Sequence, residues 1–283
     1  MPALYPYLVA LLWPYLACGP HGETARRIWP TSDPRVARAM SEARLASARR
    51  FMIQLQHLRF EDVEALDPDV LVTDYSWDGS SGRELTFEDV ARLRNRPGRP
   101  PRVVLAYMSV GEAEAYRFYW KEVSRRRGLV VNENPKWRGN FRIRYWDPAW
   151  QRVLIGGRDS YLWRIQAAGF DGVFLDTIDT AEVMADLGVQ DAPLKMAELL
   201  GAIAKASRSV DPGFLLVGQN PFVILSLPSV MESLSGISCE AHLFRGEQMV
   251  PEARPIISAL RMAKAAGLRV FVIEYPRSKK ARQ

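Results

Sequence analysis

The chain has 283 residues, of which 48% are hydrophobic and 25% are charged, proportions that exclude a disordered or fibrous protein and allow one large α/β domain. The formal net charge is +6, but the basic residues are scattered among 32 acidic ones, which argues against nucleic-acid binding. Cys18 and Cys239 are the only cysteines and show no paired Cys or His spacing, so the sequence predicts neither a disulfide framework nor a structural zinc site.

The chain begins with an apolar run over residues 4–17 that is too short to cross a bilayer comfortably and is followed directly by Cys18. This end resembles a bacterial lipoprotein signal, although no Lys or Arg precedes the run and a proline and a tyrosine interrupt it. We therefore expect a signal-like segment over residues 1–20 and an extracytoplasmic protein, secreted or attached to a membrane through a lipid on Cys18. A plain cleaved signal and a misassigned start codon are the alternatives.

Residues 21–47 are polar and rich in arginine, which is typical of a linker with one short helix, and the barrel domain is expected over residues 48–283. Seven short apolar runs then recur between polar or glycine-containing turns and are predicted to be strands. Their Val, Ile and Leu content without clean alternation indicates strands covered on both faces, and hence a parallel sheet. The predicted strands are 51–55, 70–73, 103–108, 173–175, 215–217, 237–239 and 270–273.

Helices are predicted between several of these strands. Pro148 suits the first turn of a helix, and Gly169 suits its C-terminal cap. Residues 194–207 repeat apolar side chains at the spacing of one helical face, and Pro255 and Gly267 bracket a further helix. Alternating strands and helices form either an open doubly wound sheet or a barrel, and the pattern alone does not choose between them.

The segments that follow the predicted strands are unusually acidic and polar. Because the carboxyl ends of parallel strands gather at one edge or rim, these side chains are expected to lie close together. Converging carboxylates raise one another's pKa, so that one stays protonated while another is ionised, as glycosidic bond cleavage requires. A magnesium or calcium site is the alternative use of such a cluster. The strand ends carry Asp74, Tyr107, Glu112, Asp176, Asp179, Gln219, Asn220, Glu240, Glu274 and Tyr275.

Several motifs, in order, resemble the endo-alpha-1,4-polygalactosaminidases and their relatives, a glycoside hydrolase family. The strongest is GFDGVFLDTID over residues 169–179, and the resemblance covers residues 51–275. Supporting motifs are YMSVGEAE over 107–114, YWDPAW over 145–150, Gln219-Asn220, Glu240 and Glu274-Tyr275. The resemblance implies a parallel (β/α) barrel of the TIM type, with Asp176 and Glu240 as the catalytic pair.

We therefore expect hydrolysis of an alpha-linked, amino-sugar-containing polysaccharide by paired carboxylates, without a cofactor or metal. Acidic side chains lining the cleft would suit a cationic galactosamine polymer, because they can pair with its ammonium groups. The residues expected to bind substrate are Asp74, Tyr107, Glu112, Asp179, Asn220, Glu274 and Tyr275.

Some of these positions also have purely structural interpretations. Asp171 is expected to turn the chain into its strand, and Asp179 either caps the next helix or faces the cleft. The tyrosines at 107 and 275 are either core aromatics or sugar ligands. Three tryptophans are likewise either core residues or sugar platforms: Trp77, Trp146 and Trp150.

Only residues 276–283 follow the Glu274-Tyr275 motif that ends the seventh predicted strand, so the barrel is predicted to be incomplete at the eighth strand. An open edge leaves backbone groups of the first and last strands unpaired unless another segment covers them. The segment before Phe51 is expected to be peripheral. Two further functions remain open: a non-catalytic polysaccharide-binding barrel, and a metal-dependent lyase or isomerase on the same barrel.

Overall fold

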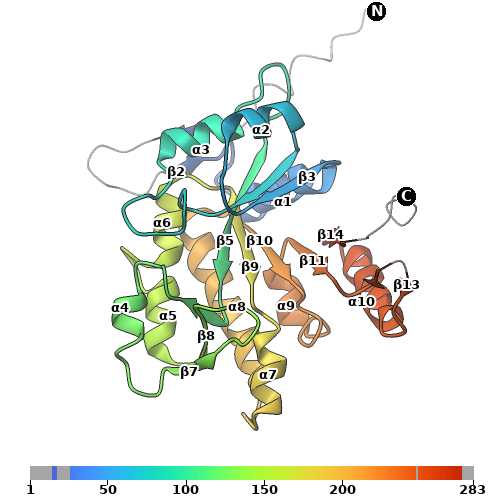
Figure 1. Cartoon of the computed structure of the whole chain (residues 1–283). Helices are drawn as coiled ribbons and strands as arrows, with labels where there is room; N and C mark the ends of the chain where they lie inside the picture. Colours follow the sequence, from blue (N-terminus) through green and yellow to red (C-terminus); the bar gives the residue numbers. More distant parts are fainter. Residues whose placement is uncertain (1–14, 18–25, 247, 276–283) are drawn as a thin grey trace, which may run out of the picture.

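The computed structural model describes residues 15–17, 26–246 and 248–275 (Figure 1). Its centre is a seven-stranded sheet in the order β14-β11-β10-β9-β5-β4-β3, and every neighbouring pair is parallel. The sheet curls into a half-barrel that is open between β14 and β3, which confirms the predicted TIM-type architecture incomplete at the eighth strand. The strands are β3 (Phe51–Gln54), β4 (Val70–Thr73), β5 (Val103–Ser109), β9 (Gly172–Asp176), β10 (Leu215–Gln219), β11 (Gly236–Glu240) and β14 (Arg269–Ile273).

All seven predicted strands are present within one or two residues of their expected bounds. The helix predicted from Pro148 to Gly169 is two helices, because the chain turns at Gly156 and a serine caps a second start. The other two predicted helices are present and begin two residues before their expected starts, at Ala192 and Ala253. The helices after β3 are α2 (Phe60–Leu66), α3 (Phe87–Arg94), α4 (Trp120–Val123), α5 (Pro148–Ile155), α6 (Tyr161–Ala167), α7 (Thr180–Asp186), α8 (Ala192–Val210), α9 (Pro228–Ser233) and α10 (Ala253–Ala265).

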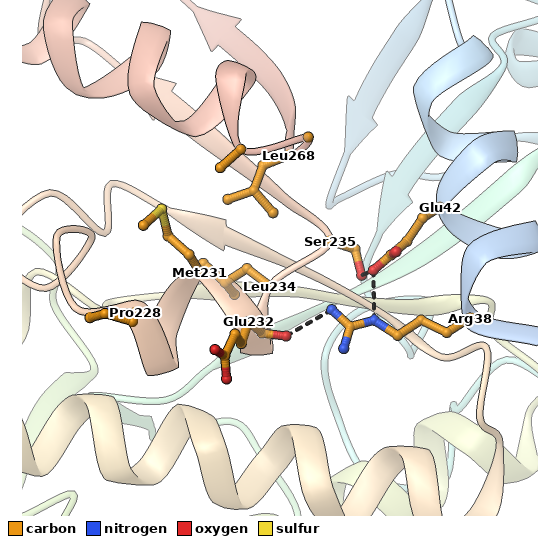
Figure 2. Close-up of a pocket in the computed structure, with 10 residues that line it drawn as sticks. Arg38, Glu42, Pro228, Met231, Glu232, Leu234, Ser235 and Leu268 are labelled. Carbon is orange, nitrogen blue, oxygen red and sulfur yellow. Dashed lines mark hydrogen bonds and ion pairs between the residues drawn. The ribbon is translucent and has the colours of Figure 1, made fainter. Parts of the chain in front are cut away.

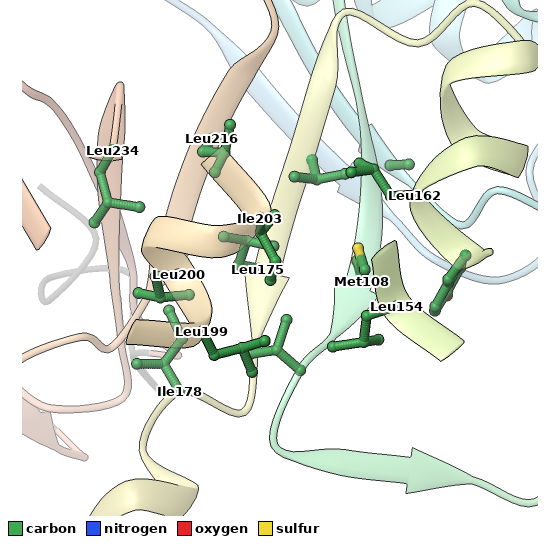
Figure 3. Close-up of a cluster of buried hydrophobic side chains, with 14 of the residues drawn as sticks. Met108, Leu154, Leu162, Leu175, Ile178, Leu199, Leu200, Ile203, Leu216 and Leu234 are labelled. Carbon is green, nitrogen blue, oxygen red and sulfur yellow. The ribbon is translucent and has the colours of Figure 1, made fainter. Parts of the chain in front are cut away.

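Alternation along the strands divides the core between two faces of the sheet. On β9, Leu175 points outward into the large cluster that the helices cover, whereas Phe174 points into a smaller cluster on the concave face. Figure 3 shows Leu175 and Leu216 of the sheet beside Leu199 and Ile203 of α8. Both faces are therefore packed, which explains why the strands read as continuous apolar runs.

Helix α1 (Pro34–Ser47) corrects the expected peripheral position of the segment before Phe51. It has 14 residues, and Asp33 caps its first turn. Its Leu45 is fully buried in the concave cluster with Leu105 and Phe174. This packing could not be predicted from the sequence, because the helix has only a few buried side chains among several arginines. The division of the chain at residue 47 stays a prediction.

Side chains bridge the open edge at the amino ends of the edge strands. The Arg269 guanidinium of β14 donates hydrogen bonds to the carbonyls of Ala46 and Ala48, which precede β3. The rings of Phe51 and Phe271 lie 5.0 Å apart. At this end, an arginine and an aromatic pair therefore bridge the gap between β14 and β3, and the described strands form no backbone hydrogen bonds across it.

Between β5 and α5 the chain forms a small antiparallel sheet that the sequence analysis missed. Its strands are β6 (Glu112–Glu114), β7 (Val130–Glu133) and β8 (Asn140–Ile143), in the order β6-β8-β7. They are short, and β7 is mostly exposed and polar, so they lack the apolar runs that marked the main strands. Figure 1 shows β7 and β8 beyond the carboxyl ends of β5 and β9.

Two further antiparallel pairs join β1 (Tyr15–Ala17) to β2 (Arg26–Ile28) and β12 (Phe244–Arg245) to β13 (Gln248–Met249). Most of the predicted signal segment, with Cys18, lies outside the described residues, so export and lipid attachment stay predictions. In the described part of the chain, no helix combines the length and hydrophobicity that a membrane span needs.

Asp171 ties three segments together at the amino end of β9. Its fully buried carboxylate accepts a hydrogen bond from the Val104 amide at 2.8 Å and lies 2.5 Å from the Arg44 guanidinium and 3.3 Å from that of Arg94. The structure therefore supports the structural interpretation of Asp171, which joins α1 and α3 to the centre of the sheet.

Replacing Asp171 with alanine is expected to lower the free energy of unfolding by about 3–5 kcal/mol, because two arginines would stay buried without their carboxylate. Urea denaturation measures this change. Glu61→Ala is the matched control, since its ion pair with Arg59 is exposed and contributes little. Equal midpoints for the two variants would contradict the role given to Asp171.

Candidate active site

The carboxyl ends of the central strands place a set of polar side chains on the concave face. The alternation that points Leu105, Phe174 and Val217 inward continues two residues later to Tyr107, Asp176 and Gln219. Glu240 ends β11, whose Gly236 and Ser238 share its parity and alternate with outward Ile237 and Cys239. The two predicted catalytic carboxylates therefore lie on the same face of the sheet, on strands separated only by β10. Their catalytic roles stay predictions.

Asp176 is a partly buried carboxyl with a raised pKa. Burial is the main cause of a pKa of about 6, and the charges of Asp179 and Glu114 add to it. The Tyr107 hydroxyl donates a hydrogen bond to Oδ2 at 2.8 Å, which opposes the rise because it favours the ionised form. Asp176 thus titrates near neutrality, as an acid–base group or nucleophile requires.

The backbone just after Asp176 is locked against the segment that follows β5. Thr177 has φ 62°, a left-handed conformation that is strained for a β-branched residue. Its Oγ1 accepts hydrogen bonds from the amides of Gly111 at 2.8 Å and Val110 at 3.2 Å. A Cβ on Gly111 would lie 2.3 Å from the Thr177 carbonyl oxygen, so only glycine fits there.

Glu240 is held by donors from both neighbouring strands. The Gln219 side-chain amide of β10 donates to Oε2, and the Tyr275 hydroxyl, just beyond β14, donates to Oε1. The hydrogen bond to Glu240 is the main reason that the pKa of Tyr275 is raised to about 12. The Asn220 side chain accepts from the Glu240 amide at 2.8 Å, so it fixes the strand ends relative to each other.

Glu112 and Asp179 extend the acidic cluster toward the β7–β8 turn. Burial raises the pKa of Glu112 to about 7, although Asn134 donates to its Oε1 at 2.8 Å and Arg142 lies 3.9 Å away. Asp179 and Asp176 contribute to this rise, which indicates that the three carboxylates share one electrostatic environment. Asp179 takes the N-cap position of α7 but makes no capping hydrogen bond, and burial raises its pKa.

Arg117 is the site residue that the sequence analysis missed. Its buried guanidinium donates to both Asp74 carboxylate oxygens, at 2.8 and 2.7 Å, and to Glu114 at 2.7 Å. It also lies over the rings of four tyrosines, including Tyr107 and Tyr116. Its spacing of three residues from Glu114 was the available sequence signal, and nothing local pointed to Asp74.

Four other residues singled out in the sequence make contacts that are mainly structural. Glu274 accepts a hydrogen bond from the Leu243 amide at 2.8 Å, so it positions the loop after β11. Trp150 is fully buried, and its indole donates to the Val110 carbonyl at 2.8 Å, which makes it a core residue. Trp77 packs edge-on against Phe60, and Trp146 is partly buried beside Tyr145.

A cavity of about 450 Å³ lies at the other end of the barrel, among α1, α9 and the segment before β14 (Figure 2). Arg38 crosses its wall, donating to the Glu232 carbonyl at 2.7 Å and to Glu42 at 2.8 Å. Leu234 and Leu268, which precede β11 and β14, give it an apolar side. Active sites of α/β barrels lie at the carboxyl ends of the strands, so this cavity is separate from the candidate active site.

Among residues 15–17, 26–246 and 248–275, no group of three or more His, Cys, Asp or Glu side chains is arranged to hold a metal ion. The acidic cluster is instead bonded to tyrosine, asparagine, glutamine and arginine side chains.

Comparison with known sequences places the whole fold in one family. The profile of glycoside-hydrolase family GH114 matches residues 32–283. An uncharacterized protein of Methanocaldococcus jannaschii is 29% identical over 233 residues, which are 78% of this chain and 65% of that protein. An uncharacterized protein of Thermotoga maritima is 34% identical over 175 residues, which are 60% of this chain and 52% of that protein. The chain thus spans between about half and two thirds of the length of these relatives.

Two solved structures share the architecture at low sequence identity. The structure of Aspergillus fumigatus Ega3 in complex with galactosamine has a TM-score of 0.63 and 16% identity, covering 83% of this chain and 80% of that one. The glycoside hydrolase domain of PelA from Pseudomonas aeruginosa has a TM-score of 0.62 and 19% identity, covering 83% and 87%. Because the family profile extends from the start of α1 through the whole sheet, the chain belongs to glycoside-hydrolase family GH114.

Proposed function

We propose that the protein is a glycosidase that cleaves an alpha-linked, amino-sugar-containing polysaccharide with Asp176 and Glu240. The observation that carries the proposal is the placement of both carboxylates at strand ends on one concave face. Membership of a glycoside-hydrolase family gives the reaction class. Both retaining and inverting glycosidases need two carboxyl groups that flank the scissile bond.

The surroundings of the two carboxyls support different roles. Asp176 receives a hydrogen bond from Tyr107, which stabilises its ionised form and suits a nucleophile or base. Glu240 is assigned as the general acid. The hydroxyl of Tyr275 can donate to ionised Glu240 and can accept from protonated Glu240, so it serves both states of an acid that loses its proton during the reaction.

An amino sugar suits the acidic cluster beside this pair. Glu112 and Asp179 are carboxylates without a bidentate arginine partner, and an ammonium group of the substrate could pair with them. Asp74 is different, because Arg117 already neutralises it, so we assign it to holding the site together. The galactosamine complex of the structurally similar Ega3 agrees with a substrate of this kind.

Location outside the cytoplasm is part of the proposal. The apolar run over residues 4–17 and Cys18 directly after it support secretion or attachment through a lipid. A polysaccharide of the cell surface or its surroundings is the substrate that such a location would offer.

Asp176→Asn keeps the shape of the side chain and removes its charge, so turnover is expected to fall by about a hundredfold or more. Mass analysis of oligosaccharides released from an alpha-1,4-linked galactosamine polymer measures the change. Glu232→Gln is the control, because its side chain is exposed at the opposite end of the barrel. Release by D176N close to that of the wild type would refute the assignment.

Glu240→Gln is expected to reduce turnover by about a hundredfold to ten-thousandfold on substrates with a poor leaving group, because the general acid is lost. The loss should be smaller for an aryl glycoside whose leaving group needs no protonation. Parallel assays with both substrate types, on protein shown by thermal melting to be folded, test this difference. An equal loss on both would argue that Glu240 is not the acid.

Activity is expected to decline as the pH falls through about 6, because Asp176 must be ionised and its pKa is about 6. Tyr107→Phe removes a hydrogen bond that lowers this pKa, so the acidic limb of kcat/KM should move to higher pH. Tyr145→Phe is the matched control, since its buried hydroxyl bonds the Ala192 carbonyl elsewhere. An unmoved limb in Y107F would show that Asp176 does not set it.

A further inference from the structure

The exposed aromatic side chains of the described chain share one location. Four rings of Phe, Tyr or Trp are more than a third exposed, and each lies in a segment that leaves the carboxyl end of β5, β11 or β14. They are Tyr116 at 48%, Trp137 at 67%, Phe244 at 37% and Tyr275 at 68%. Exposed aromatic surface confined to the rim that carries the acidic cluster indicates a surface for a ligand.

Trp137 is the most conspicuous of these rings because of how it is held. It lies in the turn between β7 and β8, where its amide donates to the Asn134 carbonyl at 3.1 Å and its carbonyl accepts from the Asn140 amide at 3.0 Å. The Asn134 side chain in turn donates to Glu112. The turn that presents Trp137 is therefore fixed directly to the acidic cluster.

The indole of Trp137 contributes little to the packing of its own hairpin. That packing is provided by Trp120 and Phe141, whose rings stack 4.4 Å apart at an interplanar angle of 26°. An indole left two-thirds exposed gains most of its apolar contacts only when a ligand covers it. The apolar C–H face of a pyranose ring is a surface of the right size and chemistry.

The order of the strands sets the direction of such a ligand. The β7–β8 hairpin leaves from β5, and Tyr275 follows β14, whereas Asp176 and Glu240 end β9 and β11 between them. Exposed rings thus stand on both sides of the carboxylate pair, as an extended chain crossing the strand ends would need.

We propose that Trp137 is a stacking platform for a sugar unit outside the cleaved bond, so that the enzyme prefers a long polysaccharide to short oligosaccharides. This inference rests on the proposed function and adds a specificity residue to it. The substrate chain passes from the β7–β8 hairpin, across the acidic cluster, toward Tyr275.

The test compares wild type with Trp137→Ala, Trp137→Phe and Val131→Ala, the last being a control for an exposed apolar residue on the same hairpin. The substrates are an alpha-1,4-linked galactosamine polymer and its trisaccharide. W137A is expected to lose about tenfold in kcat/KM on the polymer, mostly through KM, which corresponds to one stacking contact. Its trisaccharide activity should stay unchanged, and W137F should regain most of the polymer activity.

Polymer binding by Asp176→Asn with and without Trp137→Ala separates this inference from the proposed function. If the wild type cleaves neither substrate, the proposed function fails, yet weaker binding by the double variant still supports the platform. Equal polymer kinetics and binding for W137A and V131A overturn the platform while cleavage by the wild type stands. Equal losses on polymer and trisaccharide also overturn it, because they indicate a role in the reaction or in folding.

Discussion

The register between β5 and β9 is the constraint on which the candidate site depends. It pairs Ser109 with Asp176, so that Tyr107, two residues earlier on the inward side of β5, reaches the Asp176 carboxylate. A slip of β5 by one residue against β9 would turn Tyr107 to the helix-covered face while Asp176 stayed on the concave face. Close packing of Gly111 against Thr177 opposes such a slip, because the two backbones meet at a point that admits no Cβ. The position of the Asp176 carboxylate thus depends on backbone contacts between residues that take no part in the proposed reaction.

The features that could be predicted from the sequence are those that repeat along it. Apolar runs marked all seven parallel strands, and the polar residues after them marked the rim, since parallel strands gather their ends. The antiparallel strands β6, β7 and β8 were missed because they are short and mostly polar. The pairing of Asp74 with Arg117 was missed because it joins residues 43 positions apart that follow different strands. Neither spacing nor composition encodes that contact.

Arg117 changes the electrostatics of the site as much as the carboxylates do. Placed between Asp74 and Glu114, it offsets one of their two negative charges, and the other carboxylates of the cluster are Asp176, Asp179 and Glu112. Burial then raises the pKa of each of these three. An ammonium group entering the cluster would reverse part of this rise, because an opposite charge favours the ionised carboxylate. A cationic substrate would therefore help to ionise the groups that bind it.

The open edge between β14 and β3 leaves the strands that carry the two candidate catalytic carboxylates paired on both sides. Asp176 and Glu240 are on β9 and β11, which have parallel partners on both sides, whereas the open edge separates β14 from β3. The cost falls on β14, whose outer backbone groups have no strand partner in the described part of the chain and whose Val272 is 43% exposed. Arg269 and the ring pair of Phe51 and Phe271 hold its amino end, and Tyr275 bonds Glu240 near its carboxyl end. The same tyrosine that steadies the edge strand therefore also steadies the carboxyl assigned as the acid, so the stability of β14 and the geometry of Glu240 are coupled.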